Sequence, residues 1–206
     1  MTNQIFNELF ERYPCLEECK DDIKSAYDTI INCYQNGSKL LCCGNGGSAA
    51  DCDHLVGELM KGFLKKRPLS ADEKDAFGDD FVADNLQKGL PAISLCAHSA
   101  LMTAFENDAV PTLVFAQQVY AYAKEGDILI AFSTSGNSEN VVYAVKAANA
   151  KGIKTISVTG KKDSKLNELS TVCIRLPETE TFKIQELTLP VYHCLAAMVE
   201  DYFYQS

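Results

Sequence analysis

Two short loops rich in glycine, serine and asparagine contain most of the groups that could bind an anion. Residues 44–48 and residues 133–138 each follow a short apolar run and precede a helical pattern. Free backbone N–H groups at the start of a helix attract phosphate, and hydroxyl side chains add further donors. The hydroxyls of residues 133–135, with Ser138 one turn later, suit a phosphate monoester better than a carboxylate. Because serine and glycine also cap helices without binding a ligand, the interpretation depends on finding two such loops.

Histidine and carboxylate side chains at helical spacing form a second set of candidate functional residues. His54 and Glu58 follow the first loop, and their separation of four residues places them on one face of a helix. Gln185 and His193 lie in the last helical segment. Such side chains share a divalent metal or act as an acid–base pair, although His54 taken alone is more typical of a surface or core residue. His98 has no partner nearby in the sequence, and we expect it to be structural.

The elements that must position these groups follow from the pattern of apolar residues. Extended and helical segments alternate, which predicts a three-layer α/β/α sandwich with a five-stranded, mostly parallel sheet. We expect strands over 39–43, 92–96, 127–132, 154–159 and 171–176. We expect helices over 48–63, 99–105, 112–124, 139–150, 163–169 and 182–204. Both loops then lie at carboxyl ends of strands, where open α/β sheets bind ligands.

The remaining segments are expected to belong to the same domain, which would span residues 1–206. Apolar residues at helical spacing predict two helices in residues 1–36, interrupted at Pro14, and these helices are suited to packing between subunits. Residues 64–90 are charged and aperiodic, and we interpret them as an inserted loop or lid.

The composition excludes several classes of protein. A net charge of −9 disfavours a nucleic-acid-binding surface, which needs clustered lysine and arginine. No apolar run is long enough for a membrane span, and the first residues lack the apolar core of a signal peptide, so we expect a cytoplasmic protein. The nine cysteines are scattered without a C-x-x-C pair, which favours reduced thiols over disulfides. Cys15 and Cys19, one helical turn apart, would be half of a metal site at most.

The first loop also fits a dinucleotide-binding pattern. The pattern G-x-G-x-x-A is matched by Gly44, Gly46 and Ala49, and such a match is weak evidence by itself. That fingerprint requires an acidic residue about 20 positions later, at the end of a second strand. Residues 62–67 are basic and have no strand pattern, so a dinucleotide-dependent oxidoreductase is disfavoured.

The order and spacing of these motifs resemble the sugar isomerase (SIS) domain family, and within it the phosphoheptose isomerases. The resemblance spans about residues 5–204 and implies the flavodoxin-like SIS fold. It rests on Cys-Gly-Asn-Gly-Gly-Ser-Ala-Ala-Asp at residues 43–51 with His54 and Glu58, on residues 133–138, on Thr159-Gly160, and on Ile-Gln-Glu at residues 184–186 with His193.

The resemblance implies a reaction and a substrate. The chain would convert sedoheptulose 7-phosphate into D-glycero-D-manno-heptose 7-phosphate, an aldose–ketose isomerisation that passes through a cis-enediol. The residues expected to bind the phosphate are Ser133, Thr134, Ser135 and Ser138. The residues expected to contact the sugar are Asn45, Gly46, Gly47, Ser48, Glu58 and Gln185, together with Asn107 and Asp108 from the loop after the second strand.

The resemblance also implies one zinc ion per subunit, held by His54, Glu58, Gln185 and His193. Glu58 would be the general base that moves a proton between C1 and C2, with His193 as its acid partner. Zinc would polarise the sugar oxygens and stabilise the developing negative charge. On a straight helix, however, Gln185 and His193 stand about 12 Å apart along the axis. Either that helix begins in a distorted turn near Gln185, or the site takes ligands from more than one subunit.

The family resemblance further implies a homotetramer with active sites at subunit contacts, which agrees with the second explanation. Residues 65–89 are longer than the loop expected in a heptose enzyme, so an isomerase of another ketose phosphate is an alternative. A non-catalytic SIS protein that binds a phosphosugar or a protein partner is a further alternative, against which the presence of Glu58 and His193 argues.

Overall fold

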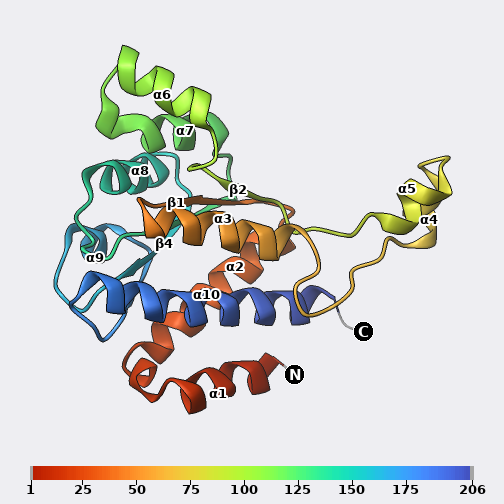
Figure 1. The fold of residues 1–206 in the computed structure, drawn as a ribbon, viewed down its shortest axis with the longest axis horizontal. Helices are drawn as coiled ribbons and strands as arrows, with labels where there is room; N and C mark the ends of the chain where they lie inside the picture. The colour runs from red at the N-terminus through yellow and green to blue at the C-terminus, as the bar shows by residue number, and fades with distance from the viewer. Residues whose placement is uncertain (1, 205–206) are drawn as a thin grey trace.

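A five-stranded sheet forms the centre of the protein, whose computed structural model describes residues 2–204. The strands lie in the order β2-β1-β3-β4-β5, and every neighbouring pair is parallel (Figure 1). The expected α/β fold with a five-stranded parallel sheet is thereby confirmed. The strands are β1 (Leu40–Cys43), β2 (Ala92–Ser94), β3 (Ile128–Phe132), β4 (Lys154–Thr159) and β5 (Val172–Arg175).

Helices cover both faces of the sheet because its central strands are apolar on both faces. Along β1, Leu40 and Cys42 pack into one core, while Leu41 and Cys43 pack into the other. The first core is covered by α2 (Lys20–Gln35), α3 (Gly47–Met60) and α10 (Thr181–Phe203). The second core is covered by α7 (Val114–Tyr122), α8 (Glu139–Ala150) and α9 (Lys165–Leu169).

The N-terminal region adds a helix outside the first of these layers. Helix α1 (Thr2–Arg12) packs against α10, on the side of α10 that faces away from the sheet (Figure 1). A 3-10 helix, η1 (Pro14–Cys19), connects α1 to α2. The chain breaks at Pro14 as expected, and the proline stands in the first turn of η1, where its missing N–H and fixed φ are tolerated.

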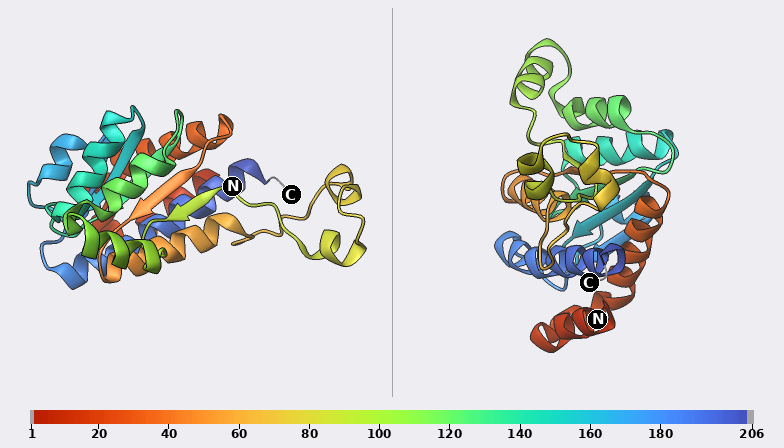
Figure 2. Two further views of the ribbon diagram at one scale, coloured as in Figure 1. Left: turned by 90° about the horizontal axis from the view of Figure 1, so that it is seen from above. Right: turned by 90° about the vertical axis from the view of Figure 1, so that its right-hand side faces the viewer.

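The inserted segment, residues 64–90, forms an arm that projects away from the body of the protein (Figures 1 and 2). It contains two short helices that the apolar pattern did not reveal, α4 (Ala71–Asp75) and α5 (Asp80–Asn85). A capping box of Ser70 and Glu73 starts α4, and Asp79 caps α5. The arm follows α3, which runs back from the carboxyl end of β1. It therefore extends away from the two loops of its own chain.

Helix α6 (Ser99–Asp108) continues one turn beyond the expected end, and η2 (Pro111–Leu113) joins it to α7. Asn107 and Asp108 thus lie in the last turn of a helix, where the amide of Asn107 donates to the carboxylate of Asp108 at 2.8 Å. The expectation of a loop was wrong because the backbone stays helical after the apolar pattern stops at Phe105. Within residues 2–204, no helix combines the length and apolar character needed to cross a membrane.

A buried carboxylate ties the start of β1 to the turn before β3. Asp127 accepts hydrogen bonds from the backbone N–H groups of Lys39 at 2.9 Å and Lys124 at 2.7 Å. The Lys39 ammonium also donates to it at 2.5 Å. The Asp127 side chain is only 3% exposed, and these three donors satisfy the hydrogen-bonding capacity of its carboxylate.

Replacing Asp127 with asparagine is expected to lower the free energy of unfolding by about 1–3 kcal/mol, because charge-assisted hydrogen bonds become neutral and one acceptor becomes a donor. Urea unfolding followed by circular dichroism measures this loss. As a matched control, Asp28→Asn breaks an exposed ion pair with Lys24 and should cost about 1 kcal/mol or less. Equal losses in the two variants would contradict the role given to Asp127.

Candidate active site

The two loops lie side by side because β1 and β3 are neighbours in the sheet. After β1 the chain continues into α3 on one face, and after β3 it continues into α8 on the other face. Ligands of α/β sheets bind at this kind of switch point. Reciprocal amide hydrogen bonds join the loops: Asn45 donates to Asn140 at 2.9 Å, and Asn140 donates to Asn45 at 2.8 Å. Sequence reasoning missed Asn140, because only the pairing of β1 with β3 brings it to Asn45.

Two glycines are required by the geometry of the first loop. Gly46 has a φ of +56°, in the left-handed region that favours glycine. At Gly47, an added Cβ would lie 2.6 Å from Nε2 of Gln185, so the absence of a side chain lets Gln185 reach the start of α3. Ser48 follows in the first turn of α3 and is buried. The structure thus places Asn45, Gly46, Gly47, Ser48 and Gln185 together at this end of α3.

The second loop presents its hydroxyls at the start of α8. The hydroxyls of Ser133 and Ser138 lie 3.1 Å apart, across the loop. Thr134 and Ser135 line a cavity of about 210 Å³ beside it. Other polar residues of this cavity are Asn137, Lys161, Lys162, Asp163, Glu178, Thr179 and Thr181. Although the carboxylates of Asp163 and Glu178 also line this cavity, the loop hydroxyls and the start of α8 are suited to an anion such as phosphate.

His54, Glu58 and His193 form a compact group between α3 and α10. One ligand atom from each lies within 4.8 Å of the others. Nε2 of His54 lies 3.0 Å from Oε1 of Glu58, and the rings of His54 and His193 meet edge to face with centroids 4.9 Å apart. The fold therefore brings together a possible metal-binding group in which His193 is 135 residues from Glu58 along the chain.

Two atoms of this group have no hydrogen-bond partner among the described residues. They are Oε2 of Glu58 and Nε2 of His193, and both are buried. Buried polar atoms in native proteins nearly always have a partner. A carboxylate oxygen and two imidazole nitrogens in one group are ligands that zinc and similar divalent ions accept. The residues present therefore fit a metal ion.

Neighbouring residues orient the His54 ring. Nδ1 of His54 lies 2.9 Å from the hydroxyl of Tyr192, which also donates to Asp51 at 3.4 Å. Burial raises the pKa of Tyr192, and the nearby Asp51 carboxylate raises it further, so the phenol keeps its proton. Because the Tyr192 hydroxyl donates its proton to Asp51, its oxygen accepts a hydrogen bond from the Nδ1–H of His54. Nε2 of the neutral His54 ring then carries a lone pair and no proton. This lone pair faces the Glu58 carboxylate, an arrangement that calls for a proton or a cation between them.

His193 lies at the edge of an apolar cavity. The cavity has a volume of about 370 Å³ and is lined mainly by residues of α1 and α10, among them Ile5, Leu9, Leu189 and Ala197. The ring of Phe63 packs beside the imidazole, with centroids 5.5 Å apart. Burial lowers the pKa of His193, and the nearby His54 lowers it further, while Glu58 acts in the opposite direction. The neutral imidazole is therefore the form present at pH 7.

Gln185 lies at a different place along α3 from this group. Its side chain ends beside Gly47, whereas His54 is seven residues further along α3, about 10 Å away along the axis. Helix α10 is helical from Thr181 onwards, so the distorted turn expected near Gln185 is not present. Asn107 and Asp108 are also remote, because α6 packs against η2 and α7 on the opposite face of the sheet. One chain thus assembles two separate sets of candidate residues.

Comparison with known proteins agrees with this fold. Two family models described as SIS domain match the chain, one at residues 6–75 and the other at residues 95–198. The parallel α/β sandwich with paired loops at its switch point is therefore that of a SIS-domain protein.

Individual similar proteins identify a narrower family within the SIS-domain proteins. The phosphoheptose isomerase of Rhodospirillum rubrum is 37% identical over 186 residues, which cover 90% of this chain and 88% of the relative. The solved phosphoheptose isomerase of Neisseria gonorrhoeae has a TM-score of 0.75 at 29% identity, covering 95% of both chains. That of Francisella tularensis has a TM-score of 0.76 at 28% identity, covering 98% of this chain and 99% of the other. The chain belongs to the phosphoheptose isomerase family and is an isomerase.

The environment of His193 predicts an unusual titration. In the metal-free protein, we expect its imidazole to lose a proton below pH 6.5, the ordinary value. Because the folded state then binds fewer protons than the unfolded state, stability falls as the pH drops below about 6.5. NMR titration of the imidazole signals measures the midpoint, and His193→Gln should remove this part of the pH dependence of unfolding. A midpoint at or above 6.5 would refute the assignment.

Proposed function

We propose that this isomerase converts sedoheptulose 7-phosphate into D-glycero-D-manno-heptose 7-phosphate with the assistance of zinc. The observation that carries the proposal is the pair of buried, unpaired atoms, Oε2 of Glu58 and Nε2 of His193, in one group with His54. A base and an acid held close together are what proton transfer between adjacent carbon atoms requires. The choice of a heptose phosphate is supported by the name that the relatives share.

Glu58 and His193 would divide the proton transfers between them. Glu58 removes a proton from C1 of the ketose with Oε2, which gives a cis-enediol, and returns the proton to C2. His193, a neutral imidazole, would give a proton to O2 and take one from O1 through the ring nitrogen that does not hold the zinc ion. The carbonyl group thereby moves from C2 to C1, and the composition of the sugar is unchanged.

The second loop would hold the phosphate. The hydroxyls of Ser133, Thr134, Ser135 and Ser138 donate to its oxygens together with free N–H groups at the start of α8. The first loop, with Asn45 and its partner Asn140, would line the sugar. Because the phosphate is remote from the reacting carbons, its binding energy serves to orient them.

His54, Glu58 and His193 would hold the zinc ion. The ion supplies positive charge that polarises the sugar oxygens and stabilises the enediolate. We propose that Gln185 completes the ligand set from a second subunit of a homotetramer. The support for this is that Gln185 and His193 are eight residues apart in α10, which stays helical through Pro190 between them. Asn107 and Asp108, exposed on α6, would likewise reach the sugar from a partner subunit.

Glu58→Gln is expected to lower kcat about 100-fold or more, because the amide cannot accept the C1 proton. Zinc should remain bound, since the amide keeps an oxygen donor. The measurement is an NMR assay of the zinc-loaded protein with sedoheptulose 7-phosphate in deuterated water, which follows the aldose and deuterium at C2. Glu17→Gln, which removes an exposed carboxylate paired with Lys20, should behave as the wild type.

Three outcomes of that assay would change the proposal. Normal turnover by Glu58→Gln would remove the role of base from Glu58. Turnover of a different ketose phosphate by the wild type would reassign the substrate. No turnover with a panel of ketose phosphates, accompanied by thermal stabilisation by one of them, would indicate a binding protein.

Mixing two inactive variants tests whether the site is shared between subunits. Gln185→Ala and Glu58→Gln should each be inactive alone. If Gln185 serves a partner's group, oligomers assembled from equal amounts should recover activity at about one quarter of their sites, by random assortment. His54→Ala mixed with Glu58→Gln is the control and should recover none, because both residues belong to one group. If subunits are shown to exchange and the first mixture still recovers no activity, Gln185 belongs to the site of its own chain.

A further inference from the structure

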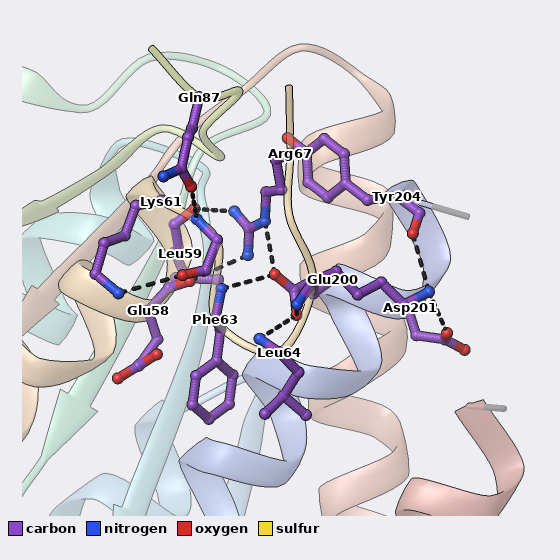
Figure 3. A network of polar contacts seen from close by, with 12 residues as sticks. Glu58, Leu59, Lys61, Phe63, Leu64, Arg67, Gln87, Glu200, Asp201 and Tyr204 are labelled. Carbon is purple, nitrogen blue, oxygen red and sulfur yellow. Dashed lines mark hydrogen bonds and ion pairs between the residues drawn. The ribbon is translucent and has the colours of Figure 1, made fainter. Parts of the chain in front are cut away.

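A buried ion pair joins the ends of α3 and α10 at the base of the arm (Figure 3). Nε of Arg67 donates to Oε1 of Glu200 at 2.8 Å, and each residue is only 1% exposed. The ring of Tyr204 packs against the guanidinium, with its centroid 4.7 Å from Cζ. The pair lies outside the group formed by His54, Glu58 and His193, yet it contacts both helices that carry this group.

Arg67 holds the last turn of α3. Its Nη1 donates to the backbone carbonyl of Leu59 at 2.6 Å, and its Nη2 donates to that of Glu58 at 3.1 Å. The last carbonyls of a helix have no partner within the helix, and a positive charge there also complements the helix dipole. Arg67 therefore fixes the stretch of main chain from which the Glu58 side chain projects.

Glu200 holds the segment that follows α3. Its carboxylate accepts the backbone N–H groups of Phe63 at 2.8 Å, Leu64 at 2.7 Å and Lys65 at 3.0 Å. The ring of Phe63 in turn packs beside the imidazole of His193. Glu200 follows His193 by seven residues, which is two helical turns, so both residues lie on one face of α10. Glu200 therefore holds Phe63 against His193.

We propose that Arg67 and Glu200 are a positioning pair that sets Glu58 and His193 relative to each other; this inference rests on the proposed function. A buried ion pair contributes little net stability compared with apolar residues of the same size. The guanidinium fork, in contrast, reaches one carboxylate and two carbonyls at once, which no apolar side chain or lysine does. The two residues act on the site through the main chain of α3 and through Phe63.

Three variants of the full chain test this pair. Arg67→Met removes all the donors of the guanidinium, and Arg67→Lys keeps the charge but loses the fork. Lys65→Met is the matched control, because it breaks the neighbouring ion pair with Asp201 at 2.8 Å on the same segment and leaves the α3 carbonyls untouched. Each variant is melted by circular dichroism, titrated with Co²⁺, whose visible absorption reports ligand number and geometry, and assayed for kcat and KM.

We expect both Arg67 variants to bind Co²⁺ about 10-fold more weakly or worse, with an altered spectrum, and to lose kcat by a similar factor. KM should stay within about 3-fold, because the phosphate loop is unchanged. Lys65→Met should stay within about 2-fold of the wild type in all three quantities, on the same reasoning. An Arg67→Met protein with a lower melting temperature but normal Co²⁺ binding and kcat would overturn the proposal. Should that variant not fold, a folded Arg67→Lys protein with normal Co²⁺ affinity and spectrum would overturn it equally.

The test separates the positioning pair from the proposed function. If the wild type turns over no ketose phosphate, the proposed function fails, while the Co²⁺ affinity and spectrum still decide whether Arg67 orders the metal-binding group. If the wild type is active and only the melting temperatures respond to the Arg67 substitutions, the positioning role fails and the proposed function stands.

Discussion

The parallel alignment of α3 with α10 is the constraint on which the candidate site depends. Contacts between the two helices follow the same order along both: Gln185 lies beside Gly47, Tyr192 beside His54, and Glu200 beside the residues that follow α3. The absence of a side chain at Gly47 lets Gln185 approach the start of α3. At the other end, the buried ion pair of Arg67 and Glu200 connects the two helices. Removing one partner of such a pair typically costs about 3–5 kcal/mol, because the other charge is left buried and unpaired.

The buried and half-buried carboxylates in this protein divide into two kinds. Asp127 and Glu200 have several donors each, and their contacts connect elements of the fold. Glu58 differs, because one of its oxygens is buried without a partner among the described residues and lies close to an equally unpaired nitrogen of His193. A polar group that the fold leaves unsatisfied is available to a ligand or a reacting proton. This contrast supports the chemical role proposed for Glu58.

The two sets of candidate residues lie toward opposite ends of α3. Asn45 and the phosphate loop are at the carboxyl edge of the sheet, whereas Glu58 is eleven residues beyond Gly47, about 16 Å along the helix. The arm begins at this second end and points away from the body (Figure 2). The two sets would meet if subunits packed with the start of α3 in one chain against the end of α3 in its partner. The proposed function includes an oligomer for this reason.

Much of this architecture could be predicted from local patterns. Strand β4 has the expected bounds, and Pro14 interrupts the N-terminal helices where expected, because apolar periodicity and proline act over a few residues. The short helices of the arm escaped prediction, since α4 buries no side chain and α5 buries only Ala83. Helix α6 was predicted too short for a related reason, as its last turn carries polar residues.

The sequence by itself determined the order of the elements, the two loops and the spacing of His54 and Glu58, since all of these depend on neighbours along the chain. Only the tertiary structure decided which distant groups meet. It joined Asn45 to Asn140, placed Gln185 beside Gly47, and brought His193 to His54 and Glu58. It also revealed the bonds from Arg67 to α3 and to Glu200. The physical reason is that strand order and helix packing set these partners, and no local pattern of residues encodes either one.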